Sequence, residues 1–125
     1  MALKILLVDD ETVFRTCIRE MKFWENGEFV LSGEAGSGDE ALAVLAEREI
    51  DLVLMDVSMP GKNGIVLSEI ISRKYPGTAI IAMSSYDDYD YVREILKNGA
   101  YDYILKSRLS EEFLVLTLKN IATRL

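Results

Sequence analysis

Four mainly apolar runs recur along the chain, at residues 5–8, 52–55, 79–83 and 103–105. The first three show no alternation with polar residues, which is typical of parallel strands that helices bury on both faces. Residues 29–35 and 101–105 are more polar, so we expect these two segments to be the edge strands of the sheet. The pattern therefore predicts five strands.

Segments with helical spacing of apolar residues separate these strands. Five helices are predicted from these positions. The first covers residues 12–22, with Phe14, Cys17, Ile18 and Met21 on its apolar face. The apolar faces of the next four contain, in order, Leu42, Leu45 and Ala46; Leu67, Ile70 and Ile71; Val92, Ile95 and Leu96; and Leu114, Leu118, Ile121 and Leu125. Ser37 and Glu40 have the spacing of a capping box, Asn98-Gly99 predicts a left-handed helix end, and Ser110 can cap the last helix. This strict alternation predicts an α/β fold, a flavodoxin-like doubly wound five-stranded parallel sheet in the order 2-1-3-4-5 with helices on both faces.

Polar side chains follow these strands where each one ends. Asp9 and Asp10 follow the first strand, Asp56 the third, Ser84 the fourth and Lys106 the fifth. The carboxyl ends of parallel strands meet at one edge, and ligands bind there at the point between the first and third strands where strand order reverses. Clustered carboxylates repel one another, and a bound Mg²⁺ ion is the most economical reason for that repulsion.

Each of these residues also has a simpler interpretation when it is taken alone. Asp10 can cap the first helix, Asp56 can form a turn, Ser84 can cap a helix and Lys106 can be a solvated surface lysine. Their convergence at one edge of the sheet is what favours a functional site.

Composition narrows the function further. The chain has 125 residues, the size of one domain, and a formal net charge of -7, which argues against nucleic-acid binding. No apolar run approaches the length of a membrane span. Cys17 is the only cysteine, so no internal disulfide can form, and this fits a reducing cytoplasmic compartment. Its place in the helical stripe predicts a core thiol. The chain contains no histidine, so a phosphohistidine in its chemistry must sit on another protein.

The motifs ILLVDDE, LVLMDVSMPGKNG, AMSSYDD and KNGAYDYILK resemble those of bacterial two-component response regulator receiver domains. The resemblance covers almost the whole chain and implies that Asp56 is the phosphoacceptor. It also implies that Asp10 binds Mg²⁺ directly, that Asp9 does so mainly through water, and that the backbone carbonyl of Ser58 completes the protein ligands.

The resemblance assigns the remaining polar residues to the phosphoryl group and to the switch. Ser84 and Lys106 should hold the phosphoryl oxygens, and Ser84 and Tyr103 should move together when phosphorylation occurs. This change should repack the surface of the fourth helix, fifth strand and fifth helix, and we expect exposed apolar residues and self-association there. The family usually has proline after the lysine; here Ser107 follows Lys106, and we predict a trans peptide bond.

We therefore expect residues 1–125 to be a receiver domain, with its output domain outside this chain. It should accept a phosphoryl group from a sensor histidine kinase and control an output such as transcription, without being a turnover enzyme. The stretch from Ser85 to Tyr91 also resembles receivers attached to AraC-type DNA-binding domains.

Two other functions stay open. One is a degenerate receiver that acts without phosphate as a protein-interaction module. The other is an aspartyl phosphatase of the haloacid-dehalogenase type, although such enzymes normally have a second aspartate where Ser58 stands, two positions after Asp56.

Overall fold

A computed structural model describes residues 2–57, 59, 63–85 and 89–125 of the chain. The strands are β1 (Leu3–Val8), β2 (Phe29–Ala35), β3 (Leu52–Asp56), β4 (Ala79–Ser84) and β5 (Asp102–Leu105). The helices are α1 (Thr12–Arg19), α2 (Gly38–Glu47), α3 (Gly64–Lys74), α4 (Tyr89–Lys97) and α5 (Glu111–Ala122), with two short 3₁₀ turns, η1 (Lys22–Asn26) and η2 (Lys106–Arg108).

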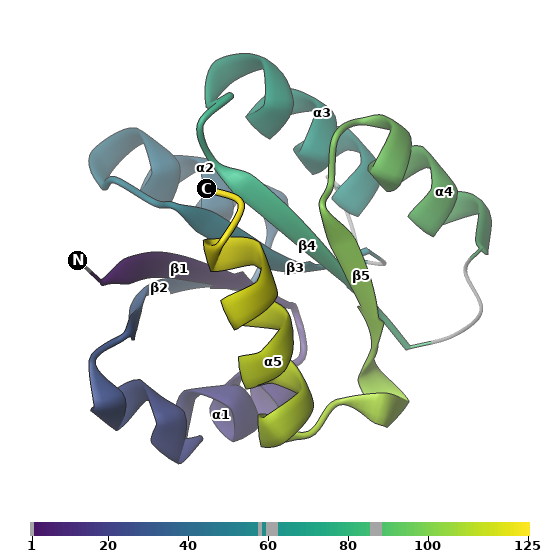
Figure 1. The fold of residues 1–125 in the computed structure, drawn as a ribbon. Helices are drawn as coiled ribbons and strands as arrows, with labels where there is room; N and C mark the ends of the chain where they lie inside the picture. The colour runs from purple at the N-terminus through teal and green to yellow at the C-terminus, as the bar shows by residue number, and fades with distance from the viewer. Residues whose placement is uncertain (1, 58, 60–62, 86–88) are drawn as a thin grey trace.

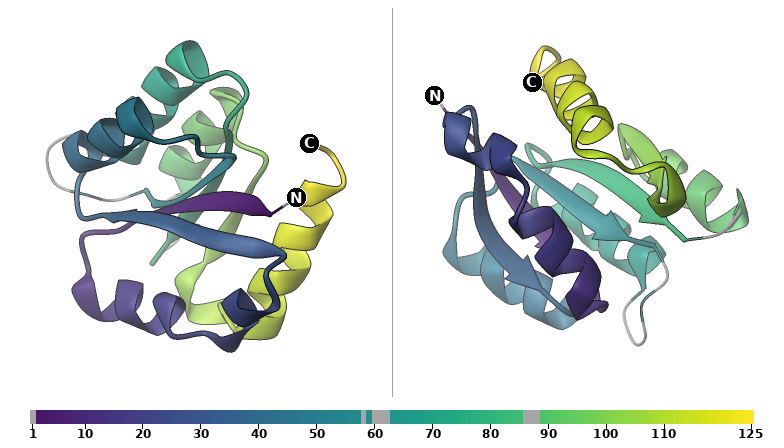
Figure 2. Two further views of the ribbon diagram at one scale, coloured as in Figure 1. Left: turned by 90° about the vertical axis from the view of Figure 1, so that its left-hand side faces the viewer. Right: turned by 90° about the horizontal axis from the view of Figure 1, so that it is seen from below.

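All five strands pair in parallel, in the order β2-β1-β3-β4-β5, which confirms the predicted topology. Helices α1 and α5 cover one face of the sheet, and α2, α3 and α4 cover the other (Figures 1 and 2). The two more polar strands, β2 and β5, are the edges, as expected.

The central strands carry apolar residues on both of their faces because they supply two cores. Leu6 and Val8 of β1 belong to the core under α2 and α3, whereas Ile5 and Leu7 belong to the core under α1 and α5. Successive side chains of a strand point to opposite faces, so a strand between two helical layers needs apolar residues at every position.

Helix ends follow the local signals in the sequence. The Ser37 hydroxyl accepts a hydrogen bond from the Glu40 backbone N–H at 3.2 Å, and the Glu40 carboxylate accepts one from the backbone N–H of Gly36 rather than of Ser37. The Ser110 hydroxyl caps α5 by accepting from the Phe113 N–H at 3.1 Å. Gly99 has a φ of 103°, the left-handed conformation predicted after α4.

Two predictions about individual positions are wrong, and a third is confirmed. Cys17 is exposed and is not a core thiol, because the buried face of α1 centres on Ile18 and the preceding residue lies about 100° away around the helix. Leu125 is exposed because α5 ends at Ala122. The Lys106-Ser107 peptide bond is trans, as predicted.

The first helix is also shorter than the predicted 12–22. It ends at Arg19, and the chain then forms η1, in which Phe23 is buried. The Ile18 carbonyl accepts a hydrogen bond from the Met21 backbone N–H at 3.1 Å and a second one from the Trp24 indole N–H at 2.8 Å. A tighter turn and a side-chain donor thus satisfy this carbonyl where the helix ends.

Candidate functional site

The sheet register brings the polar strand ends together. Val8 lies opposite Met55, so Asp9 leaves β1 beside the end of β3, where Asp56 stands. Asp56 lies opposite Met83 in β4, and Ser84 lies opposite Leu105 in β5, directly before Lys106. Four strands thus deliver their terminal side chains to one edge of the sheet, as the sequence predicted.

Lys106 is the centre of this arrangement. Its ammonium nitrogen lies 2.7 Å from Asp9 Oδ2, 2.7 Å from Glu11 Oε1 and 3.3 Å from Asp56 Oδ2. The Phe14 ring lies beside it, with the nitrogen 4.4 Å from the ring centroid, a cation–π contact. The Lys106 side chain is only 9% exposed, so it is not the solvated lysine of the simpler interpretation.

Asp9 and Asp56 are both buried carboxylates. Asp9 is fully buried, and its Oδ1 accepts a hydrogen bond from the Glu11 backbone N–H at 2.8 Å. Its Oδ2 faces Lys106 and makes no hydrogen bond of good geometry within the described part of the chain. Burial raises the pKa of Asp9 above its ordinary value of 3.8, although the Lys106 ammonium 2.7 Å away opposes this shift.

The pKa of Lys106 moves in the direction that favours its charge. Burial by itself would lower the pKa of this ammonium, but the contacts with Asp9, Glu11 and Asp56 outweigh burial and raise it. Lys106 therefore stays protonated at physiological pH, and it faces three carboxylates with a single positive charge.

The carboxylates fit a divalent cation. Among the residues that the structure describes, Asp9, Glu11 and Asp56 offer ligand oxygens that all lie within 4.8 Å of one another. Hard carboxylate oxygens, one of them lacking a good hydrogen bond, are the donor set that Mg²⁺ prefers. An acidic cluster that can bind a metal therefore exists at the predicted edge.

The ligand set differs in part from the one expected from the sequence. Asp10 is exposed and does not belong to this carboxylate group, so its role as a direct ligand stays a prediction. The carbonyl of Ser58 lies outside the described residues. Glu11 was missed; its only signal was that it extends the acidic run after β1.

The predicted switch residues lie on neighbouring strands. Ser84 is fully buried at the end of β4, next to Asp56, whereas the Tyr103 side chain on β5 is 44% exposed. Tyr103 thus points away from the core in this state of the protein.

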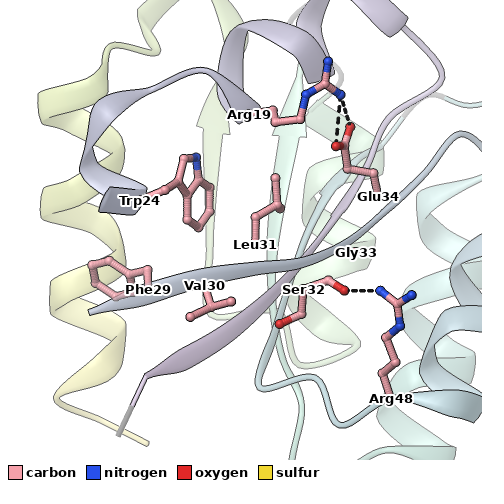
Figure 3. A pocket seen from close by; sticks show the side chains of 9 residues that line it. All are labelled: Arg19, Trp24, Phe29, Val30, Leu31, Ser32, Gly33, Glu34 and Arg48. Carbon is pink, nitrogen blue, oxygen red and sulfur yellow. Dashed lines mark hydrogen bonds and ion pairs between the residues drawn. The ribbon is translucent and has the colours of Figure 1, made fainter. Parts of the chain in front are cut away.

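A separate hollow of about 480 Å³ lies at the opposite edge of the sheet, along β2 (Figure 3). Both of its arginines are engaged: Arg19 contacts the Glu34 carboxylate at 3.0 and 3.1 Å, and Arg48 donates to the Ser32 carbonyl. Ser32 is the extra residue of a β-bulge, since the register passes from Leu31 to Gly33. This arrangement protects an edge strand from pairing, and we assign it a structural role.

The fold, with acids after β1 and β3 and a lysine after β5, is that of a response regulator receiver domain. The chain belongs to the response regulator receiver domain family, whose sequence model matches residues 5–118.

Relatives and solved structures agree with this assignment. The chain is 37% identical over 115 residues to the oxygen regulatory protein NreC of Staphylococcus haemolyticus, covering 90% of this chain and 52% of that protein. It is 36% identical over 103 residues to an uncharacterised response regulatory protein of Staphylococcus epidermidis, covering 82% of this chain and 40% of that protein. The chain thus spans about half the length, or less, of these curated relatives.

Solved receiver domains share the fold closely. The receiver domain of AraT, a response regulator from Geobacillus stearothermophilus, superposes with a TM-score of 0.89 at 29% identity, covering 99% of this chain and 95% of that one. The receiver domain of a putative response regulator NarL from Mycobacterium tuberculosis has a TM-score of 0.84 at 26% identity, covering 98% and 97%. Within the described residues, no helix is long and apolar enough to cross a membrane.

Proposed function

We propose that Asp56 accepts a phosphoryl group from a phosphohistidine of a sensor histidine kinase. An Asp56 carboxylate oxygen attacks phosphorus, the P–O bond forms as the P–N bond breaks, and the imidazole leaves with the kinase. The observation that carries this proposal is the position of Asp56: buried at the end of β3, with the Lys106 ammonium 3.3 Å from its Oδ2. Catalysis of phosphoryl transfer is mainly positioning and charge neutralisation, which these residues can supply.

Lys106 and Ser84 would bind the transferred group. The ammonium donates to phosphoryl oxygens from β5, and the Ser84 hydroxyl donates from β4. Asp9 and Asp56 would hold Mg²⁺, with Asp10 and the Ser58 carbonyl as further ligands. When bound, Mg²⁺ would neutralise negative charge on the phosphoryl oxygens.

Ser84 and Tyr103 would convert this event into a change of surface. Ser84 moves toward the phosphoryl group, and the exposed Tyr103 ring turns inward into the space that Ser84 leaves. A change from 1:99 to 99:1 between two states requires about 5.5 kcal/mol. Hydrogen bonds to charged groups contribute about 1.5–3 kcal/mol each, so two or three new contacts suffice.

The repacked α4-β5-α5 surface would transmit the signal to an output. We propose self-association through this surface in the cytoplasm, with transcription controlled by an attached domain; an AraC-type output stays a prediction. With a net charge of -7, this domain is not expected to bind nucleic acid directly. Water would later attack the acyl phosphate, so the domain assists its own slow dephosphorylation without being a turnover enzyme.

Intact mass spectrometry tests phosphoryl uptake. The wild type, incubated with Mg²⁺ and acetyl phosphate, should gain the mass of one phosphoryl group, and Asp56→Asn should gain none. Equal labelling of the variant would contradict the assignment. No uptake despite Mg²⁺ binding would favour the phosphate-independent module, and steady hydrolysis of small phosphate esters would favour the phosphatase.

A further inference from the structure

Carboxylates already surround the Lys106 ammonium. It donates hydrogen bonds to Glu11 at 2.7 Å and Asp56 at 3.3 Å, and Asp9 Oδ2 forms an ion pair with it at 2.7 Å. The Phe14 ring occupies a further side of the nitrogen. A phosphoryl oxygen that approaches this ammonium must therefore compete with the carboxylates that already contact it.

Glu11 is the partner that can leave at least cost. Asp56 is the proposed acceptor itself, and Asp9 is fully buried and held by the Glu11 backbone N–H at 2.8 Å. The Glu11 side chain is 58% exposed, so its carboxylate can turn into water and be solvated there. Leaving water-accessible Glu11 unpaired costs far less than leaving a buried carboxylate unpaired.

The charge of a phosphoryl group adds to this argument. A phosphorylated side chain carries about −1.5 to −2 charge. Glu11 belongs to the group of carboxylates whose oxygens lie within 4.8 Å of one another, so its charge would repel the new one. Departure of Glu11 relieves that repulsion and frees a Lys106 donor in one movement.

We propose that Glu11 is a positioning residue that holds Lys106 while Asp56 is unphosphorylated and competes with the phosphoryl group for the same ammonium. This inference rests on the proposed phosphoacceptor function. Glu11, which was not among the predicted site residues, would thereby control how fast Asp56 is phosphorylated.

The ion pair can be tested without any phosphoryl donor. In ¹⁵N NMR of the full chain without Mg²⁺, Glu11→Gln should shift the Lys106 Nζ resonance and speed exchange of its ammonium protons. Glu20→Gln is the matched control, because it removes the same charge from the exposed end of α1. A Lys106 signal that responds equally to both substitutions, or to neither, would overturn the pairing.

The competition is tested with acetyl phosphate at saturating Mg²⁺, which removes any difference in cation affinity. Intact mass spectrometry should find Asp56 phosphorylated about two- to five-fold faster in Glu11→Gln than in the wild type, the factor contributed by an exposed ion pair. Glu20→Gln should match the wild type. An unchanged or slower Glu11→Gln would overturn the competition. A wild type that takes up no phosphoryl group would instead refute the acceptor function and the competition with it, while the NMR comparison would still decide whether the ion pair exists.

Discussion

At the scale of single residues, the site is defined by an imbalance of charge. Three carboxylates, from Asp9, Glu11 and Asp56, share the one ammonium of Lys106. The excess negative charge, together with burial, lowers the stability of the folded state. It also favours the binding of a cation, which would neutralise that charge. Such costs are typical of functional sites.

The first prediction concerns that cost. Because burial raises the pKa of Asp9 above 3.8, the folded state keeps this proton to a higher pH than the unfolded chain does. Ionisation of Asp9 therefore lowers the free energy of unfolding as the pH rises from 3.8 through the raised pKa of the folded state. Without Mg²⁺ at pH 7, Asp9→Asn should raise the melting temperature by about 3–5 °C, corresponding to about 1 kcal/mol.

Calorimetry at several pH values checks this prediction. The advantage of Asp9→Asn should narrow as the pH falls toward 3.8, whereas the control Glu20→Gln should differ little from the wild type throughout. A less stable Asp9→Asn at pH 7 would mean that the Lys106 ion pair outweighs the burial of Asp9.

The second prediction concerns Asp10. Mg²⁺ should raise the melting temperature of the wild type, because it binds only to the folded state. At a Mg²⁺ concentration of 100 times the dissociation constant, the free energy of unfolding should increase by about 2.7 kcal/mol. Asp10→Ala should stay folded, because this side chain is exposed, and should lose most of the response to Mg²⁺. An Asp10→Ala protein with the full response would leave Asp9, Glu11 and Asp56 as the carboxylate ligands.

At the scale of elements, the junction of β3 and α3 fixes the position of Asp56. Gly64 begins α3, and its N–H donates to the Val57 carbonyl at 2.9 Å. A Cβ atom at Gly64 would lie 2.8 Å from Val57 Cα and 3.2 Å from the carbonyl oxygen of Asp56. The helix can approach the strand end this closely only with glycine at this position.

Gly64→Ala should therefore lower the free energy of unfolding by about 1–3 kcal/mol, the usual cost of overpacking, and slow phosphorylation of Asp56. Denaturant titration measures the first effect and intact mass spectrometry the second. Gly77→Ala is the control, because a Cβ there meets no heavy atom within 4 Å. Equal stability of the two variants would contradict the steric argument.

Much of this architecture could be predicted because the signals are local or follow from topology. Uninterrupted apolar runs identify central strands, and the polar runs at residues 29–35 and 101–105 identify the edges. The meeting of Asp9, Asp56 and Lys106 follows from parallel strands ending at one edge.

The remainder depends on how side chains reach across elements. Glu11 enters the site only because Lys106 extends from the end of β5 toward β1. Cys17 was misplaced because its exposure depends on the rotation of α1 about its axis, which Ile18 sets by packing into the core. The turn η1 was missed because the Ile18 carbonyl takes its hydrogen bonds from the Met21 N–H and the Trp24 indole, and the sequence pattern does not show these contacts.

At the scale of the whole molecule, partly exposed aromatic residues occur on α4, on α5 and on or directly before β5. Tyr91, Tyr101, Tyr103 and Phe113 are each between 37% and 44% exposed. This partly confirms the expected exposure of apolar residues on this surface. Clustered exposed apolar groups often mark interaction sites.

If this surface mediates self-association, a phosphoryl mimic should strengthen it. Sedimentation velocity with Mg²⁺ and beryllofluoride should detect a dimer in the wild type that Phe113→Glu abolishes. Val30→Glu is the control, since Val30 has similar exposure but lies on β2 at the opposite edge of the sheet. A dimer that survives Phe113→Glu, or a monomer under all conditions, would remove this surface as the dimer interface.

The central claim is that one carboxylate, Asp56, receives the phosphoryl group. Borohydride reduction of the phosphorylated protein converts an aspartyl phosphate into homoserine, and peptide mass spectrometry then locates the modified residue. We predict homoserine at position 56 alone, dependent on Mg²⁺ and on the phosphoryl donor. Homoserine at Asp9 or Asp10 with Asp56 unmodified, or no homoserine in a protein that has gained phosphoryl mass, would contradict the account.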